Sequence, residues 1–164
     1  MSRTPQRPVL ALLGWFAVCF AVAAVGAVAS ASAGEFYASL QRPTWAPPAA
    51  LFGPVWTVLY AMMAVSAWLV WRKGGWRRQR AALLLFLGQL VLNGLWSWLF
   101  FGWRLGGLGF ADILLLIGLL LATLAAFWHA SRAAALLLVP YLVWICFAAA
   151  LNWSVWQANP AILG

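Results

Sequence analysis

The chain has 164 residues, of which 66% are hydrophobic and only 7% are charged. A soluble domain carries roughly 25% charged residues and a disordered chain needs low hydrophobicity, so the composition excludes both classes. With two acidic residues in the whole chain, few groups remain for acid–base catalysis. We expect an all-α integral membrane protein, in which the net charge of +8 sets orientation and does not indicate nucleic acid as a partner.

Five apolar runs without lysine or arginine are each long enough to cross about 30 Å of hydrocarbon as a helix. They cover roughly residues 9–31, 51–71, 81–101, 108–128 and 133–156. None alternates apolar and polar residues as the strands of a membrane barrel do. The sequence therefore predicts a five-transmembrane-helix bundle, with a single domain over residues 1–164.

The first run has a second interpretation. Arg3 and Arg7, the apolar stretch and the small residues at positions 29–33 resemble a secretory signal peptide and its cleavage site. The apolar part of a signal peptide has roughly 7–15 residues, and this stretch is longer. The length favours a helix that is retained in the membrane.

The basic residues segregate to one side of the predicted bundle. Only Arg42 and Arg104 fall on the other side, and the majority side holds Arg3, Arg7, Arg72, Lys73, Arg77, Arg78, Arg80 and Arg132. The positive-inside rule places the N-terminus in the cytoplasm and the C-terminus outside. We expect the cytoplasmic membrane, with an outer membrane as the alternative, and the cluster at 72–80 also suits anionic lipid head groups.

The longest connection, residues 32–50, follows the first run and contains Pro43, Pro47 and Pro48. Prolines fix φ and restrict the preceding residue, so we expect a stiff, extended or turn-rich lid on the outer side. Tyr37 and Trp45 also lie in this segment. A loop that is merely anchored at the interface by these two aromatic residues is the alternative.

No catalytic or metal-binding set of residues is visible. Cys19 and Cys146 are expected to be small buried apolar residues, and the single histidine, His129, lacks the further ligands that a metal site needs. Asp112 is the only acid inside a predicted span. We expect it to pair with Arg104 or Arg42, with a proton or ligand role as the alternative.

Polar and aromatic residues recur at helical spacing on three predicted spans. They are Gln89, Asn93 and Ser97 with Trp96 beside them; Trp56, Tyr60 and Met63; and Tyr141, Trp144, Ala148 and Leu151 with Asn152 adjacent. Hydrogen bonds and packing between helices are one explanation. Because most of these residues fall in the outer half of the bundle, the other is a single apolar and aromatic cavity beneath the lid.

Two ladders of small residues at i+4 spacing predict close helix packing, within the chain or between two copies. They are Ala23, Ala27 and Ala31, and Gly118, Ala122 and Ala126.

Several motifs together resemble the TspO/MBR family, the tryptophan-rich sensory or translocator proteins. The stretch FYASLQRPTWAPP at 36–48 is similar to the family pattern WYxxLxKPxWxPP, and PVWTVLY at 54–60, LNGLWS at 92–97, VPYLVW at 139–144 and ALNW at 150–153 follow in order. The resemblance implies a five-helix membrane protein, commonly a homodimer. It also implies binding of porphyrins such as protoporphyrin IX under the first loop, and of sterols or synthetic ligands in some members.

By matching positions, the resemblance implies a ligand pocket formed by Tyr37, Pro47, Trp56, Asn93, Trp96, Trp144, Ala148 and Leu151. Trp56 and Trp144 match tryptophans involved in light-driven porphyrin breakdown in some members, which makes them the catalytic candidates. Phe36 departs from the first tryptophan of the lid motif, and Thr44 stands at a position that can be aromatic. The sterol motif of animal members is broken at Trp153 and Gln157, so sterol binding is not expected.

The leading functional hypothesis is a porphyrin-binding membrane sensor or regulator that also moves or sequesters porphyrins, with no required cofactor or metal. Its partners would be the porphyrin, the lipid bilayer and a second copy of the chain. One alternative is an enzyme that degrades porphyrins with light and oxygen. The other is a non-catalytic packing or adaptor protein.

Overall fold

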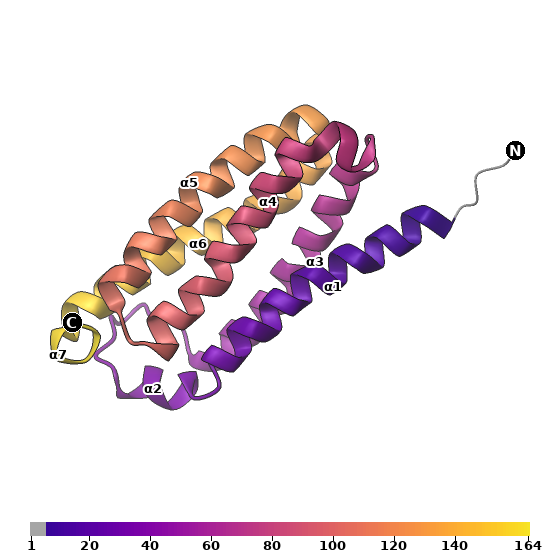
Figure 1. Cartoon of the computed structure of the whole chain (residues 1–164). Helices are drawn as coiled ribbons and strands as arrows, with labels where there is room; N and C mark the ends of the chain where they lie inside the picture. The colour runs from indigo at the N-terminus through magenta and orange to yellow at the C-terminus, as the bar shows by residue number, and fades with distance from the viewer. Residues whose placement is uncertain (1–5) are drawn as a thin grey trace, which may run out of the picture.

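The computed structural model describes the backbone of residues 6–164. These residues form five long helices, α1 (Gln6–Ala29), α3 (Phe52–Trp71), α4 (Gly75–Ser97), α5 (Gly106–Ala130) and α6 (Arg132–Ala158), arranged as an antiparallel bundle (Figure 1). All five are long and apolar enough to cross a membrane, which confirms the predicted helical bundle. Arg3 lies outside the described residues.

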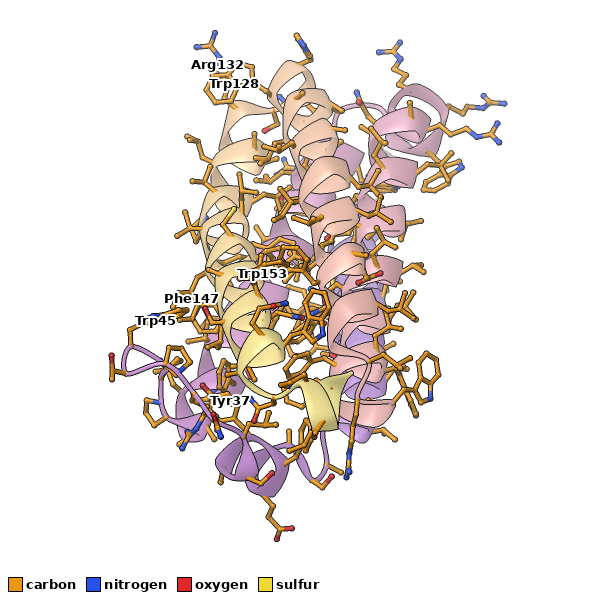
Figure 2. The ribbon with its side chains drawn as sticks, turned by 90° about the vertical axis from the view of Figure 1, so that its left-hand side faces the viewer. Tyr37, Trp45, Trp128, Arg132, Phe147 and Trp153 are labelled. Atoms are coloured by element: carbon orange, nitrogen blue, oxygen red, sulfur yellow. The ribbon has the colours of Figure 1, made fainter. Side chains whose placement is uncertain are left out.

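Because the chain reverses direction after each long helix, the bundle has two chemically different ends. The α3–α4 and α5–α6 connections lie at one end with residues 72–80 and Arg132, termed the basic end. The segment between α1 and α3 covers the opposite, lid end (Figure 1). Figure 2 shows Trp128 and Arg132 at the basic end, and Tyr37 and Trp45 at the lid end. Within the bundle, α5 packs against α4 and α6, while α1 packs against α3 and α4.

Helix α4 begins six residues before the predicted boundary at 81, at Gly75, and includes Arg77, Arg78 and Arg80. Arginine and glutamine are good helix formers, so the fall in hydropathy marks where the helix leaves the hydrocarbon and not where it begins. Gln79 has non-helical angles, φ −111° and ψ 19°. The helix is therefore kinked between its basic first turn and its apolar remainder.

The lid, residues 32–50, begins with a short helix, α2 (Ala33–Ser39), and ends with a single 3-10 turn, η1 (Ala49–Leu51). The expectation of an extended or turn-rich lid is correct for the middle of the segment and wrong for its start. The first proline of the lid is Pro43, so no proline prevents residues 33–39 from forming a helix. This helix buries Phe36 and Tyr37 against the bundle. It ends at Leu40, whose backbone is extended.

At the lid end, α4 continues into a π-helical turn, η2 (Trp98–Gly102). This turn places Phe100 in a second core beneath the lid, separate from the main core between the long helices. The members of this second core are Phe36, Tyr37, Leu40, Phe100, Leu151, Val155 and Leu163. The lid is thus held on the bundle by its own hydrophobic contacts.

The cysteines differ from the expectation in one case. Cys19 is fully buried in the main core, as expected, whereas Cys146 is exposed on the outer face of α6. A small apolar side chain is compatible with a lipid-facing position as well as with a core. Apolarity alone did not reveal which face of α6 carries Cys146.

The tight connection between α3 and α4 depends on Gly74. Its φ is 140°, and an added Cβ would lie 2.5–2.9 Å from side-chain carbons of Arg78. Side chains rarely tolerate such a conformation. This glycine therefore allows the two helices to lie side by side.

We expect Gly74→Ala to lower the free energy of unfolding by about 1–3 kcal/mol, because a side chain is forced into a strained backbone conformation. Unfolding of the purified protein in detergent measures the change. Gly14→Ala is the matched control, since an added Cβ there meets no atom within 4 Å and alanine favours the helix. Equal destabilisation of the two variants would contradict the role assigned to Gly74.

Candidate functional site

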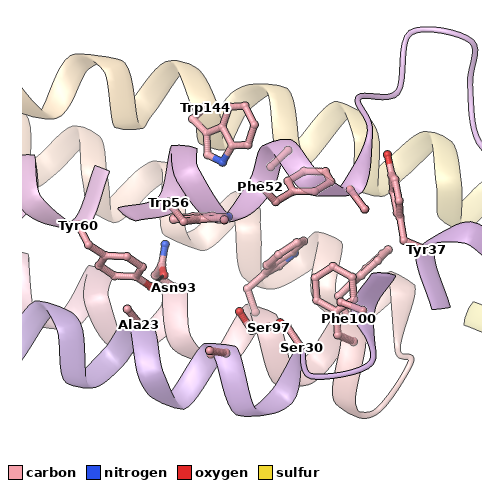
Figure 3. A pocket seen from close by; sticks show the side chains of 18 of the residues that line it. Ala23, Ser30, Tyr37, Phe52, Trp56, Tyr60, Asn93, Ser97, Phe100 and Trp144 are labelled. Atoms are coloured by element: carbon pink, nitrogen blue, oxygen red, sulfur yellow. Dashed lines mark hydrogen bonds between the residues drawn. The ribbon is translucent and has the colours of Figure 1, made fainter. Parts of the chain in front are cut away.

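A cavity of about 620 Å³ lies beneath the lid, between α1, α3, α4 and α6. This volume is in the range of small-molecule sites, roughly 300–1,000 Å³. Figure 3 shows its side chains pointing inward from helices on both sides. The aromatic part of the wall consists of Phe20, Tyr37, Phe52, Trp56, Tyr60, Trp96, Phe100, Phe101 and Trp144.

The structure brings together most of the residues predicted for the site. Seven of the eight line this one cavity: Tyr37, Trp56, Asn93, Trp96, Trp144, Ala148 and Leu151. Pro47 is not part of the wall, but its carbonyl oxygen accepts a hydrogen bond of 3.2 Å from the Tyr37 hydroxyl. Pro47 therefore acts on the cavity indirectly, by positioning Tyr37.

At the end of the cavity away from the lid, polar side chains from three helices form a buried hydrogen-bond network. The Tyr60 hydroxyl donates to Asn93 Oδ1, and Asn93 Nδ2 donates to the Tyr141 hydroxyl over 2.7 Å. The Tyr141 hydroxyl in turn donates to Gln89 Oε1 over 3.0 Å. All four side chains are buried. Since burying an unpaired polar group is costly, the network links α3, α4 and α6 in one arrangement.

The two sequence-based explanations of the polar stripe on α4 are therefore compatible. Gln89 serves only to hold helices together, Ser97 lines the cavity, and Asn93 does both.

The orientation of the Trp96 ring is fixed by hydrogen bonds and by stacking. Its indole nitrogen donates to Asn152 Oδ1 over 3.1 Å, and Asn152 Nδ2 donates to the carbonyl oxygen of Gly106 over 3.0 Å. The ring also stacks on Phe100, with 5.5 Å between centroids and 12° between planes. Asn152 thereby joins α4, α5 and α6 and gives the cavity one flat, rigid wall.

The other two tryptophans of the cavity lie on α3 and α6. Trp56 packs against Tyr60 and Tyr141, with centroid distances of 5.6 and 6.2 Å. Trp144 packs edge-on against Phe52 at 6.0 Å. A flat aromatic ligand between these rings would be offered stacking and edge contacts from several sides.

The lid is fastened to the end of α6 by a reciprocal pair of hydrogen bonds. The backbone N–H of Gln41 donates to Asn159 Oδ1, and Asn159 Nδ2 donates to the carbonyl oxygen of Gln41, both over 2.9 Å. A second attachment is the edge-on contact of Trp45 with Phe147, at a centroid distance of 5.7 Å. Figure 2 shows these two rings at the margin of the lid.

Two arginines also reinforce the lid by lying over its aromatic rings. The guanidinium of Arg42 is 4.7 Å from the Tyr37 ring centroid, and that of Arg104 is 5.0 Å from the Phe36 ring centroid. Burial raises the pKa of the Tyr37 hydroxyl, although Arg42 partly opposes the rise. The phenol therefore keeps its proton at neutral pH and remains a donor to Pro47.

The expected ion pair of Asp112 with Arg104 or Arg42 is wrong. Asp112 is buried on α5, and its Oδ2 has no hydrogen-bond partner among the described residues. The two arginines instead contact the aromatic rings of the lid. The sequence suggested a pair because Asp112 and both arginines lie near the lid end. In the structure the carboxyl of Asp112 is buried in the helix bundle, whereas the guanidinium groups lie over aromatic rings of the lid.

One whole wall of the cavity, the one formed by α1, is absent from the site predicted from the sequence. Its members are mostly small: Phe20, Ala23, Ala24, Gly26, Ala27 and Ser30. Ala23 and Ala27 belong to a ladder of small residues that by itself predicts only close helix packing. The absence of bulky residues from this stretch was the signal that could have indicated a cavity.

In chemical terms the cavity offers flat aromatic surfaces and a few hydroxyl and amide groups. No group of three or more histidine, cysteine, aspartate or glutamate side chains in the described part of the chain could hold a metal ion. A ligand would therefore be held mainly by shape and stacking.

The profile of the TspO/MBR family matches residues 15–157, which include the lid and nearly all of the bundle. The chain belongs to the TspO/MBR family. Translocator protein of Ovis aries is 45% identical over 127 residues, which are 76% of this chain and 75% of the relative. Tryptophan-rich protein TspO of Chlorobaculum tepidum is 39% identical over 158 residues, 94% and 99% of the two chains.

A third relative, Tryptophan-rich sensory protein of Cereibacter sphaeroides, is 33% identical over 147 residues, 90% of each chain. The family membership confirms the resemblance seen in the motifs. Together with the five apolar helices, it makes this TspO/MBR protein an integral, multi-pass membrane protein.

We expect Asn159→Ala to loosen the lid of this TspO/MBR protein, because both hydrogen bonds to Gln41 disappear. Amide hydrogen exchange of residues 36–42 should become faster, since exchange reports local opening. Gln157→Ala is the control, because Gln157 is exposed on the last turn of α6. Unchanged protection in Asn159→Ala would show that the hydrophobic contacts alone hold the lid.

Proposed function

We propose that this TspO/MBR protein is a membrane sensor or regulator that binds a flat tetrapyrrole, such as protoporphyrin IX, in the cavity beneath the lid. The observation that carries the proposal is the aromatic wall, in which Trp56, Trp96 and Trp144 come from three different helices. A large planar ring can stack on the aromatic side chains of such a wall. A ligand rich in charge would find no compensating partner along the buried part of the cavity.

The lid end supplies the polar surroundings that the edge of a porphyrin requires. Porphyrins of this kind carry carboxylates on one side of the ring. Arg42 lies over Tyr37, which itself lines the cavity, and Arg104 lies on the same part of the lid. An orientation with the ring among the tryptophans and the carboxylates toward these arginines satisfies both parts of the ligand.

The names of two relatives, Translocator protein and Tryptophan-rich sensory protein, describe moving and sensing, and we assign this chain to the same class of role. We also propose a homodimer in the cytoplasmic membrane. In this arrangement the basic end faces the cytoplasm, in keeping with the positive-inside rule, and the lid and C-terminus face outward.

Binding of protoporphyrin IX should quench tryptophan fluorescence saturably. We expect Trp144→Ala to weaken binding by about 0.5–1.5 kcal/mol, roughly two- to tenfold in Kd, because one aromatic contact is lost. Trp128→Ala is the control, since Trp128 lies at the basic end and outside the cavity. Equal affinities of wild type and Trp144→Ala would reject the assignment of Trp144.

A second candidate function, light-dependent breakdown of the bound porphyrin, is favoured by one observation. Trp56, Tyr60 and Tyr141 are in ring contact, which gives an excited ligand oxidisable neighbours. The balanced reaction adds one molecule of oxygen across a carbon–carbon double bond of the ring. That bond is cleaved into two carbonyl groups, and no external reductant is required.

For this second function we expect bleaching of the bound porphyrin, under light and oxygen, to be slower in Trp56→Phe and Trp144→Phe than in wild type. Phenylalanine keeps a flat ring but is harder to oxidise than tryptophan. The porphyrin absorption spectrum gives the rate, with matched occupancy as the control. If wild type bleaches the ligand no faster than detergent micelles do, the enzymatic candidate fails.

A further inference from the structure

The residues that line the cavity are not equally buried on all sides. Every cavity residue contributed by α4 and α6 is buried or half-buried. The exposed members of the wall all come from α1, α2, η1 and α3: Phe20, Ala24, Ala27, Gly34, Ala49, Gly53 and Thr57. Phe20 contacts Tyr60 at the end nearer the basic end, with 6.3 Å between ring centroids, and the other six are small. This exposed stretch between α1 and α3 is termed the side opening.

The sequence of α1 explains why the side opening is present. Residues 21–30 are exclusively alanine, valine, glycine and serine, whereas Trp15, Phe16 and Phe20 lie toward the basic end. The small residues let α1 approach α4 closely, since a Cβ on Gly26 would lie 3.1 Å from Ser97 Oγ. On the α3 side the same residues carry nothing large enough to fill the gap. Figure 3 shows Ala23 and Ser30 facing Phe52 and Trp56 across the cavity.

The lid, by contrast, closes the route from water. Lifting it would break the reciprocal hydrogen bonds between Gln41 and Asn159. It would also expose Phe36, Tyr37 and Leu40, which are now 9%, 4% and 5% exposed. Exposing large apolar side chains to water is unfavourable. On the lid side of the Phe20–Tyr60 contact, passage between α1 and α3 separates only small residues, Ala24 and Ala27 from Gly53 and Thr57. Helix α1 is also the least buried of the five long helices.

We propose that the ligand enters and leaves the cavity sideways from the bilayer, through the side opening between α1 and α3, and not from water past the lid. This inference rests on the proposed binding function. The opening lies within five residues of the ends of both helices, Ala24 before Ala29 and Thr57 after Phe52. At 1.5 Å per residue this is about 8 Å from the helix ends, the depth at which an amphiphilic ring rests between head groups and acyl chains.

The route selects a class of ligand. A molecule must first partition into the lid-side half of the membrane, and it must be thin enough to pass edge-on between two helices. A planar, mostly apolar ring with its polar groups on one edge meets both conditions. A water-soluble tetrapyrrole derivative with charged groups on all sides meets neither, even if it fits the cavity.

The test uses the full chain reconstituted in lipid nanodiscs, with protoporphyrin IX as the probe and tryptophan quenching followed by stopped flow. Gly53→Phe and Ala27→Phe narrow the opening from its two sides, and a side chain at Gly53 has open space, with no atom within 4 Å of an added Cβ. Gly14→Phe is the matched control on α1, also in open space and outside the cavity wall. Asn159→Ala loosens the competing lid route.

We expect association and dissociation both to slow about tenfold in Gly53→Phe and in Ala27→Phe, as when binding waits for a conformational change, and to be unaltered in Gly14→Phe and Asn159→Ala. Unaltered rates in both phenylalanine variants would overturn the side route, as would faster association in Asn159→Ala. Weaker binding that arises only from faster dissociation would also overturn it, because the two positions would then contact the ligand instead of its path. Absence of any quenching in the wild type would refute the proposed function itself.

Discussion

The hydrogen-bond network of Tyr60, Asn93, Tyr141 and Gln89 is the constraint on which the rest of the structure depends. Inside a bilayer no water is available to satisfy these groups, so α3, α4 and α6 can pack only where all four meet. Their meeting point determines the floor of the cavity and, one or two turns closer to the lid, the places of Trp56, Trp96 and Trp144. The network fixes the spacing between the three helices, and this spacing keeps the three tryptophan rings apart.

The sequence was sufficient for the fold and for most of the cavity, because both follow from periodic patterns. Apolar runs of membrane length indicated the spans, and polar or aromatic residues at i+4 spacing identified the inward face of each helix. The stripes on α3, α4 and α6 contain six of the seven predicted residues that the structure brings together in the cavity wall, and the seventh, Tyr37, lies in the lid. Asn152, which the sequence places only beside the stripe on α6, orients Trp96 by accepting a hydrogen bond from its indole nitrogen.

What the sequence did not reveal has physical causes. The wall contributed by α1 consists mostly of small residues. Ala24 and Ala27, for example, leave space but carry no polar or aromatic group that would indicate a site. The short helix at Ala33–Ser39 was hidden by the prolines that follow it, and the kink at Gln79 by the basic residues around it. The ion pair predicted for Asp112 was wrong because a buried carboxyl suggests a charged partner, whereas Arg42 and Arg104 contact aromatic rings. Each of these depends on tertiary contacts and not on local pattern.

The latch between Gln41 and Asn159 joins residues that are 118 positions apart, and this has a consequence for how the protein is made. Chains are synthesised and inserted from the N-terminus, so α2 leaves the ribosome long before its fastening residue exists. The cavity floor, complete once Tyr141 is in place, is assembled before the cover is locked. During biogenesis the site therefore passes through an uncovered stage, and it becomes enclosed only after Asn159 has been synthesised.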